Sequence, residues 1–214
     1  MASGDRLFSL STVFATSSLL ISCVTLYFSN LAPPSLAMVA GPNIKVYYPA
    51  DGGFGLYLPV AFVNSSAATG TVYRLGVSLT AKKPGAEVFY FEWRNFTRWS
   101  DQVGLDEPAH ALAVQGNSAI AKIVWMTWRA DSEPKLVIQP GDYTLAVHVW
   151  TKPSGLPETQ LHELTVDAAT YTTLEHERTN KQDFLVDVTL DRQLPPNRLL
   201  TNSEAISLLG LPKN

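Results

Sequence analysis

The sequence of 214 residues contains a single cysteine, Cys23, which lies inside an apolar stretch near the N-terminus. The rest of the chain therefore has no disulfide, no thiolate nucleophile and no cysteine ligand for a metal. A blue-copper centre is excluded on the same ground, because it needs a cysteine ligand. A domain of about 170 residues tolerates the lack of disulfides, since its core is large enough without them.

Charge is sparse as well: 16% of residues are charged, and the net charge is −3. Binding to nucleic acid needs clustered Lys and Arg, which the chain lacks, so we exclude nucleic acid as a partner. The four histidines, His110, His148, His162 and His176, lack the short repeated spacings of zinc sites. No nucleophile elbow, phosphate-binding loop or catalytic carboxylate pair is recognisable. We expect no cofactor and no enzymatic activity.

Residues 7–28, in contrast, form a run of 22 residues without a charge, glycine or proline. As a helix this run would be roughly 33 Å long, against about 30 Å for the hydrocarbon core of a bilayer. It predicts a transmembrane helix after a short stub, residues 1–6. Arg6 precedes the run and no Lys or Arg follows until Lys45, which favours a cytoplasmic N-terminus and a periplasmic or extracellular domain. A signal peptide cleaved near Ala37 is the alternative, although the run is long for one.

Small residues follow one face of this predicted helix. They are Ser11, Ala15, Ser18, Ser22 and Thr25, at alternating spacings of four and three. In lipid, such a face lets another helix approach closely and form hydroxyl hydrogen bonds. It indicates packing against membrane protein subunits within the bilayer. The alternative is chance, because eight of the 22 residues are Ser or Thr.

Residues 29–43 contain Pro33, Pro34, Gly41 and Pro42 and predict a semi-extended spacer. Beyond them, from residue 44 to 192, apolar residues recur with a period of two and turn residues separate the runs. The expected strands are 44–48, 56–63, 71–80, 88–94, 118–128, 143–150, 161–166, 171–177 and 184–190. Pro59 predicts an edge or a bulge. No helical period is evident in this region, so the pattern predicts an all-β sandwich or barrel.

The stretch from Ile138 to Leu145, Ile-Gln-Pro-Gly-Asp-Tyr-Thr-Leu, resembles the turn and tyrosine that open the penultimate strand of immunoglobulin-like and fibronectin-like sandwiches. The resemblance implies that the Tyr143 hydroxyl bonds back to upstream backbone. The paired cysteines and the usual core tryptophan are absent, so the likeness is to the disulfide-free class, over about residues 44–190. It implies an immunoglobulin-like β-sandwich carried on a single N-terminal transmembrane helix, a fold used for adhesion, spacing and subunit contact.

Aromatic and arginine side chains are concentrated between Phe89 and Trp99. Alternation directs Tyr90 and Arg94 outward, and these residue types anchor protein interfaces and stack on sugar rings. We predict an interface for protein or glycan formed by Tyr90, Arg94, Phe96, Arg98 and Trp99. Packing of the same residues into the core and its loops is the alternative.

The tail, residues 193–214, differs from the rest. Residues 201–204, Thr-Asn-Ser-Glu, have the form of a capping box before the apolar residues 205–209, so a short helix is expected there. Such a helix is unstable alone and must dock on its own sandwich or on a partner.

Two functions remain. The first is a non-catalytic, membrane-anchored accessory or structural subunit of a larger membrane protein complex, which contacts its partners through the helix and the exported domain. The second is a free-standing envelope or cell-surface module that binds protein or glycan through residues 89–99.

Overall fold

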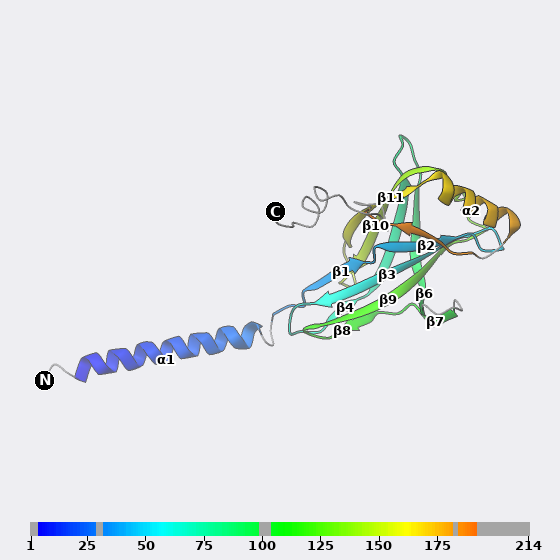
Figure 1. Ribbon diagram of the computed structural model, residues 1–214. Helices are drawn as coiled ribbons and strands as arrows, with labels where there is room; N and C mark the ends of the chain where they lie inside the picture. The colour runs from blue at the N-terminus through cyan, green and yellow to red at the C-terminus, as the bar shows by residue number, and fades with distance from the viewer. Residues whose placement is uncertain (1–3, 29–31, 99–103, 182–183, 192–214) are drawn as a thin grey trace, which may run out of the picture.

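The computed structural model describes residues 4–28, 32–98, 104–181 and 184–191. Within these ranges the protein is predominantly β, as expected. Helix α1 (Gly4–Leu26) projects from one side of the β domain, and α2 (Ala168–Asn180) packs at the opposite side (Figure 1). The strands are β1 (Leu36–Ala40), β2 (Asn43–Tyr47), β3 (Phe54–Asn64), β4 (Gly70–Val72), β5 (Arg74–Ala81), β6 (Val88–Arg98), β7 (Gly104–Pro108), β8 (Leu112–Val114), β9 (Ser118–Trp128), β10 (Gly141–Trp150), β11 (Glu158–Val166) and β12 (Val186–Thr189).

One ten-stranded sheet dominates the domain, in the order β11-β10-β5-β6-β9-β3-β2-β12, with β1 paired to β3 and β7 paired to β6. The two ends of this order meet at a seam between β11 and the end of β12. There Leu164 and Leu190 form an antiparallel bridge, and the backbone N–H of Asp191 donates to the carbonyl of Glu163 at 2.7 Å. The sheet is therefore nearly closed into a barrel. The strand pattern left a sandwich and a barrel open, and the two separate facing sheets that the immunoglobulin-like resemblance implied are not what the structure shows.

Strand β6 turns the corner of this sheet. Its first half pairs with β5 and its second half with β9, and the register shifts between Trp93 and Asn95. A bulge of this kind bends the strand and reverses the alternation of its side chains. As a result Phe96, which simple alternation from Tyr90 placed outside, is 1% exposed.

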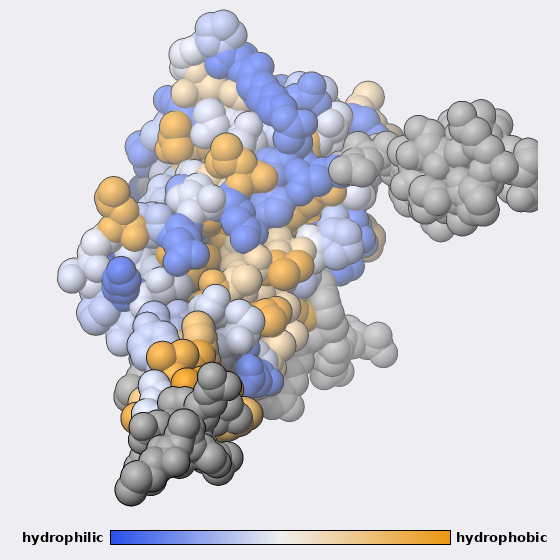
Figure 2. Space-filling model, turned by 90° about the vertical axis from the view of Figure 1, so that its left-hand side faces the viewer, coloured by the Kyte–Doolittle hydropathy of each residue, from blue (hydrophilic) through white to orange (hydrophobic). Residues whose placement is uncertain are grey.

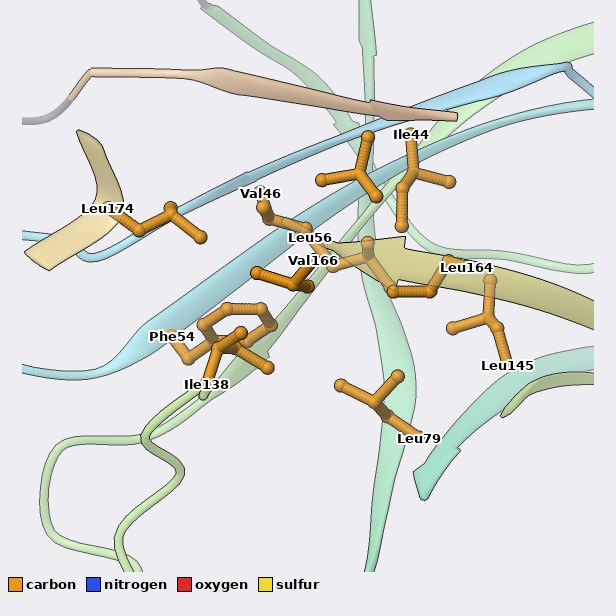
Figure 3. Close-up of a pocket in the computed structure, with 11 residues that line it drawn as sticks. Ile44, Val46, Phe54, Leu56, Leu79, Ile138, Leu145, Leu164, Val166 and Leu174 are labelled. Carbon is orange, nitrogen blue, oxygen red and sulfur yellow. The ribbon is translucent and has the colours of Figure 1, made fainter. Parts of the chain in front are cut away.

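The core is apolar and follows the predicted alternation. Leu75, Val77 and Leu79 on β5 are buried, as are Leu145 and Val147 on β10. Figure 3 shows apolar side chains from several strands and α2 pointing toward one another around a small void of ≈ 20 Å³. The lining carries no polar group to hold a water or a polar ligand, so the void is packing space rather than a binding site.

Two tyrosine hydroxyls fix the segment that precedes β10. Tyr143 Oη accepts the N–H of Gln139 and donates to the carbonyl of the same residue, both at 2.9 Å. The backbone hydrogen bond that the resemblance implied for this tyrosine is thereby confirmed. Tyr48 Oη accepts the N–H of Ile138 at 2.8 Å, and burial raises the pKa of Tyr48 to about 12. Tyr48 therefore stays neutral at physiological pH.

The expected strand 171–177 is wrong, because these residues belong to helix α2. Asp167 caps the helix: its Oδ1 accepts the N–H of Thr170 at 2.8 Å. Leu174 and Glu177, three positions apart, are the buried residues of the helix. The β-branched threonines within 171–177 favour a strand by propensity, but the cap and the buried helical pair outweigh that preference.

The predicted spacer is also only partly correct. Residues 36–40 within it form β1, which pairs with β3 in an antiparallel ladder. Pro59 was expected at an edge or a bulge, but it lies inside β3. It is next to the break between β1 and β2, which consists of Gly41 and Pro42, and Gly41 N–H donates to the Pro59 carbonyl at 2.8 Å. The predicted tail helix over 201–209 lies outside the described residues.

The N-terminal apolar run is helical, as predicted. In the part of the chain that the structure describes, however, no helix combines the length and the apolar character needed to cross a membrane. The transmembrane assignment of residues 7–28 is therefore not supported.

Candidate functional site

The structure divides the five residues of the predicted interface. Tyr90 and Arg94 are exposed on β6, whereas Phe96 is buried against Trp93, with ring centroids 5.5 Å apart. Trp99 and the side chain of Arg98 lie outside the described part of the structure. Only Tyr90 and Arg94 therefore remain as surface candidates from this stretch.

Tyr90 belongs to a larger constellation on the outer side of β6, β5, β10 and β11. Antiparallel pairing sets Ser78 opposite Tyr90 and Gly76 opposite Glu92, and it sets Gly76 opposite His148 on β10. Side chains opposite one another in a ladder share a face of the sheet. We call this surface the aromatic face; it consists of Arg74, Gly76, Ser78, Tyr90, Glu92, His148, Trp150 and Thr159.

Tyr90 lies across β5 because Gly76 leaves room for it. A Cβ atom on Gly76 would be only 2.4 Å from Tyr90 Oη and 2.8 Å from two ring carbons. The tyrosine is nevertheless 40% exposed, so it contacts the sheet and still presents surface to solvent. Burial raises the pKa of Tyr90, with a further contribution from Glu92, which keeps the hydroxyl protonated.

His148 is held between two hydroxyl groups. Its Nε2 is 2.9 Å from Ser78 Oγ, and its Nδ1 is 2.9 Å from Thr159 Oγ1. Burial lowers the pKa of His148, so the imidazole is neutral at physiological pH and has one donor and one acceptor nitrogen for these bonds. Its ring centroid lies 6.2 Å from that of Tyr90 and 6.3 Å from that of Trp150.

Arg74 connects the aromatic and the charged parts of the face. Its guanidinium carbon lies 3.8 Å from the centroid of the Trp150 ring, a cation–π arrangement. One of its nitrogens is also 3.8 Å from a carboxylate oxygen of Glu92, and about half of each side chain is exposed. The two charges offset one another, and both groups keep hydrogen-bonding capacity toward solvent.

Arg74, Glu92, His148 and Trp150 were not among the residues predicted from the sequence. The signal was present, since Arg74 and Gly76 alternate with the buried residues of β5, and His148 and Trp150 alternate with those of β10. What the sequence did not reveal is that β10, β5 and β6 are adjacent, because β10 follows β5 only after four intervening strands. Spatial adjacency of these strands, rather than residue type, makes the face.

Open hollows elsewhere on the described part of the molecule include two that border β9. One, of ≈ 760 Å³, lies over β1, β3 and β9 and is lined mostly by small apolar residues such as Ala61 and Ala121. The other, of ≈ 510 Å³, is bordered by Arg94, Trp125 and Asp131. Among the described residues, no group of three or more His, Cys, Asp or Glu side chains is arranged to hold a metal ion.

Helix α1 presents the second surface of interest. Ser11, Ala15, Ser18, Ser22 and Thr25 are all exposed. Two hydroxyls on the helix bond to its own backbone: Ser22 Oγ donates to the Ser18 carbonyl, and Thr16 Oγ1 donates to the Thr12 carbonyl, both at 2.8 Å. Among the helix residues whose side chains the structure describes, the large apolar ones are 47–66% exposed, from Val24 at the low end to Leu19 at the high end.

Figure 2 shows the side of the molecule from which α1 projects, where hydrophobic residues are interspersed among hydrophilic ones on the domain surface. On α1, the large apolar side chains of Leu19, Leu20 and Ile21 are 64–66% exposed.

The chain matches no protein-family model and no curated protein. Among solved structures, it is similar to a family 123 glycoside hydrolase from Clostridium perfringens, with 10% identity over 60% of this chain and 26% of that chain, at a TM-score of 0.34. It is also similar to the sporulation control protein Spo0M from Bacillus subtilis, with 9% identity over 64% of this chain and 51% of that one, at a TM-score of 0.32. A third is the β-glucosidase DesR from Streptomyces venezuelae, with 15% identity over 61% and 15% of the respective chains, at a TM-score of 0.30.

This chain spans about half the length of Spo0M and a smaller share of the two hydrolases. Likenesses at these scores support no inference about the activity of the chain.

Proposed function

We propose that the protein is a non-catalytic accessory subunit of a larger membrane protein complex, held at the membrane by α1. The observation that carries this proposal is the exposure of α1: the helix projects from the β domain (Figure 1), and its large apolar side chains from Val13 onward are 47–66% exposed. Exposed apolar area is unfavourable in water by roughly 25 cal/mol per Å², so such a helix is stabilised when its apolar surface is removed from water. In the proposal, lipid and a partner helix together bury this surface.

The hydroxyl-rich side of α1 is compatible with that environment. A hydroxyl group in lipid must find its hydrogen-bond partner within the protein. The hydroxyls of Thr16 and Ser22 do this within the helix, by donating to the carbonyls of Thr12 and Ser18. The small side chains of Ser18 and Ser22 allow a neighbouring helix to approach closely. Arg6 precedes the helix and no Lys or Arg follows until Lys45, which supports an N-terminus in the cytoplasm and a β domain in the periplasm or outside the cell as part of the proposal.

The β domain then acts as the exported part of the subunit. We assign it to the disulfide-free immunoglobulin-like class as part of the proposal, on the strength of the Tyr143 hydrogen bonds to Gln139. The sheet is nearly closed, and the hydroxyls of Tyr48 and Tyr143 hold the segment before β10 by hydrogen bonds. The domain is therefore a rigid body suited to covering a partner rather than to wrapping around one.

The test is a double variant, Ser18→Leu with Ser22→Leu, expressed in the full chain. A matched control, Ile21→Leu with Val24→Leu, changes the other side of the same helix. We expect all three proteins in the membrane fraction after alkaline carbonate treatment. Proteins that copurify with the wild type in mild detergent should be lost from the Ser18/Ser22 variant and kept by the control.

Two results would contradict the proposal separately. Recovery of the wild type in the aqueous fraction without detergent would remove the membrane role. An unchanged set of copurifying proteins in the Ser18/Ser22 variant would remove the helix contact.

A second candidate function is a free-standing envelope or cell-surface binding module. It is favoured by the aromatic face, where Tyr90, Trp150 and Arg74 are held in place by the sheet yet reach solvent. Isolation of the wild type from membranes without any stoichiometric companion would favour this candidate over the first.

A further inference from the structure

We propose that the aromatic face binds a neutral carbohydrate, with Tyr90 as the stacking platform. This proposal narrows the second candidate function to one ligand class and does not depend on α1. It is carried by the position of Tyr90 over Gly76 and by the polar groups around it.

Carbohydrate recognition needs an aromatic surface that is both exposed and fixed. Pyranose rings with equatorial substituents have apolar faces made of C–H groups, and these pack on aromatic rings. Tyr90 is 40% exposed, and its close approach to Gly76 holds it against β5. The residue therefore offers a pre-positioned surface, which reduces the entropy lost when a ligand is bound.

The neighbouring polar groups match the hydroxyls of a sugar. Tyr90 and Glu92 are two positions apart on β6 and so share a face, and Arg74 lies within 3.8 Å of Glu92. Arginine supplies several N–H donors in one plane and carboxylate supplies acceptors, whereas each sugar hydroxyl can do both. Because the Arg74 and Glu92 charges are already paired, a neutral ligand leaves neither one without a counter-charge.

The arrangement fits a sugar better than it fits a protein. Typical protein interfaces have an apolar centre and a polar rim. Here the order is reversed: Gly76, Ser78 and His148 occupy the middle of the face. The large exposed apolar side chains, Val88 at 64% and Leu161 at 69%, lie toward its margins on β6 and β11.

The experiment uses the full chain in a detergent whose headgroup is not a sugar. The probes are cellohexaose, N-acetylchitohexaose and maltohexaose, and the readouts are saturation-transfer NMR on the sugar C–H protons and titration calorimetry. We expect at least one probe to show transfer to its C–H protons. Tyr90→Ala should weaken binding about tenfold or more, since the stacking surface is removed.

Three further variants make the result specific. Gly76→Ala keeps the tyrosine but places a Cβ 2.4 Å from its hydroxyl, so it should displace the ring and weaken binding as well. Tyr90→Phe keeps the ring and should retain binding. Tyr73→Ala, which removes a tyrosine of similar exposure (42%) outside the face, should leave binding unchanged. Circular dichroism melts confirm that each variant is folded.

The proposal is overturned if the wild type shows no transfer to any of the three probes. It is equally overturned if Tyr73→Ala weakens binding as much as Tyr90→Ala, or if Tyr90→Phe abolishes it. None of these results bears on the membrane role, which is tested through α1 alone.

Discussion

Phe96 and Arg94 illustrate how one irregularity in a strand decides the role of a side chain. They lie close together on β6, but the bulge between Trp93 and Asn95 leaves Arg94 exposed and buries Phe96. Phe96→Ala should lower the free energy of unfolding by about 3–5 kcal/mol, because it leaves a cavity in the core. Arg94→Ala should change it by less than about 0.5 kcal/mol. Urea unfolding of both variants checks this prediction, and equal effects would contradict it.

Glu177 is a polar side chain in an unfavourable position. It is 8% exposed on α2, and its Oε2 atom is buried and has no hydrogen-bond partner among the described residues. Because an unsatisfied buried oxygen is destabilising, Glu177→Met should raise the free energy of unfolding by about 1 kcal/mol. The exposed Glu87 provides the control, since Glu87→Met should leave the thermal midpoint almost unchanged. A lower midpoint for Glu177→Met would show that its carboxylate stabilises the helix.

Residue patterns predicted which side chains of the sheet are buried in the core better than which ones form its surface sites. The buried positions of β5 and β10 follow from the local alternation of residues. The Tyr143 hydroxyl bonds to Gln139 were implied by the resemblance of residues 138–145 to immunoglobulin-like sandwiches. The burial of Phe96 does not follow from local sequence, because a bulge is a mismatch between two paired strands and depends on the partner strand as well as on β6. The same limit applies to Arg74 and Trp150, whose contact joins two strands that are distant in sequence.

At the level of secondary structure, helix α2 shows which local signal was underweighted. The threonines within residues 171–177 favour a strand by propensity. Two local signals favour a helix instead. Asp167 is an N-cap residue whose side chain accepts the N–H of Thr170, and Leu174 and Glu177 are buried on one side of the helix. Strand β1 was missed for the opposite reason, since proline and glycine on both sides of residues 36–40 made the segment resemble a spacer.

The seam between β11 and β12 depends on a carboxylate and therefore on pH. Asp191 Oδ1 accepts the Glu163 N–H at 2.7 Å, and Oδ2 lies 2.5 Å from His162 Nδ1. Burial raises the pKa of Asp191, but the hydrogen bonds from His162 and Glu163 outweigh that effect and hold it below its ordinary value. The bonds thus stabilise the fold above the ordinary carboxyl pKa, and this contribution is lost as pH falls through the lowered value.

Asp191→Asn measures that contribution. The variant should be less stable than the wild type at pH 6, and the difference should shrink as the pH is lowered toward 3. Urea unfolding at a series of pH values gives both free energies. A difference that stays constant over this range would show that the ionisation of Asp191 does not strengthen the seam.

For the molecule as a whole, closure of the sheet is the feature that local periodicity does not encode. Alternation predicts which side of each strand is buried, but it says nothing about the order of the strands. The Gln160 side-chain amide donates to the Met38 carbonyl at 2.8 Å, which brings together the first and last parts of the domain, and the bridge between Leu164 and Leu190 closes the seam between β11 and the end of β12. The all-β class was therefore predictable, whereas the choice between a two-sheet sandwich and a nearly closed single sheet was not.

The separation of α1 from the domain leads to the last prediction. Every residue of the apolar core lies at Met38 or beyond, so a variant that begins at Ala32 should keep the full core. Its thermal midpoint, measured by circular dichroism, should equal that of the full chain in detergent within about 2 °C, since a loss of 1 kcal/mol would shift it by about 2–4 °C. The membrane proposal further predicts that the full chain is recovered in the membrane fraction and this variant in the aqueous fraction. A lower midpoint would mean that α1 packs on the sheet, and retention in the membrane would mean that a surface of the β domain itself binds lipid or a membrane partner.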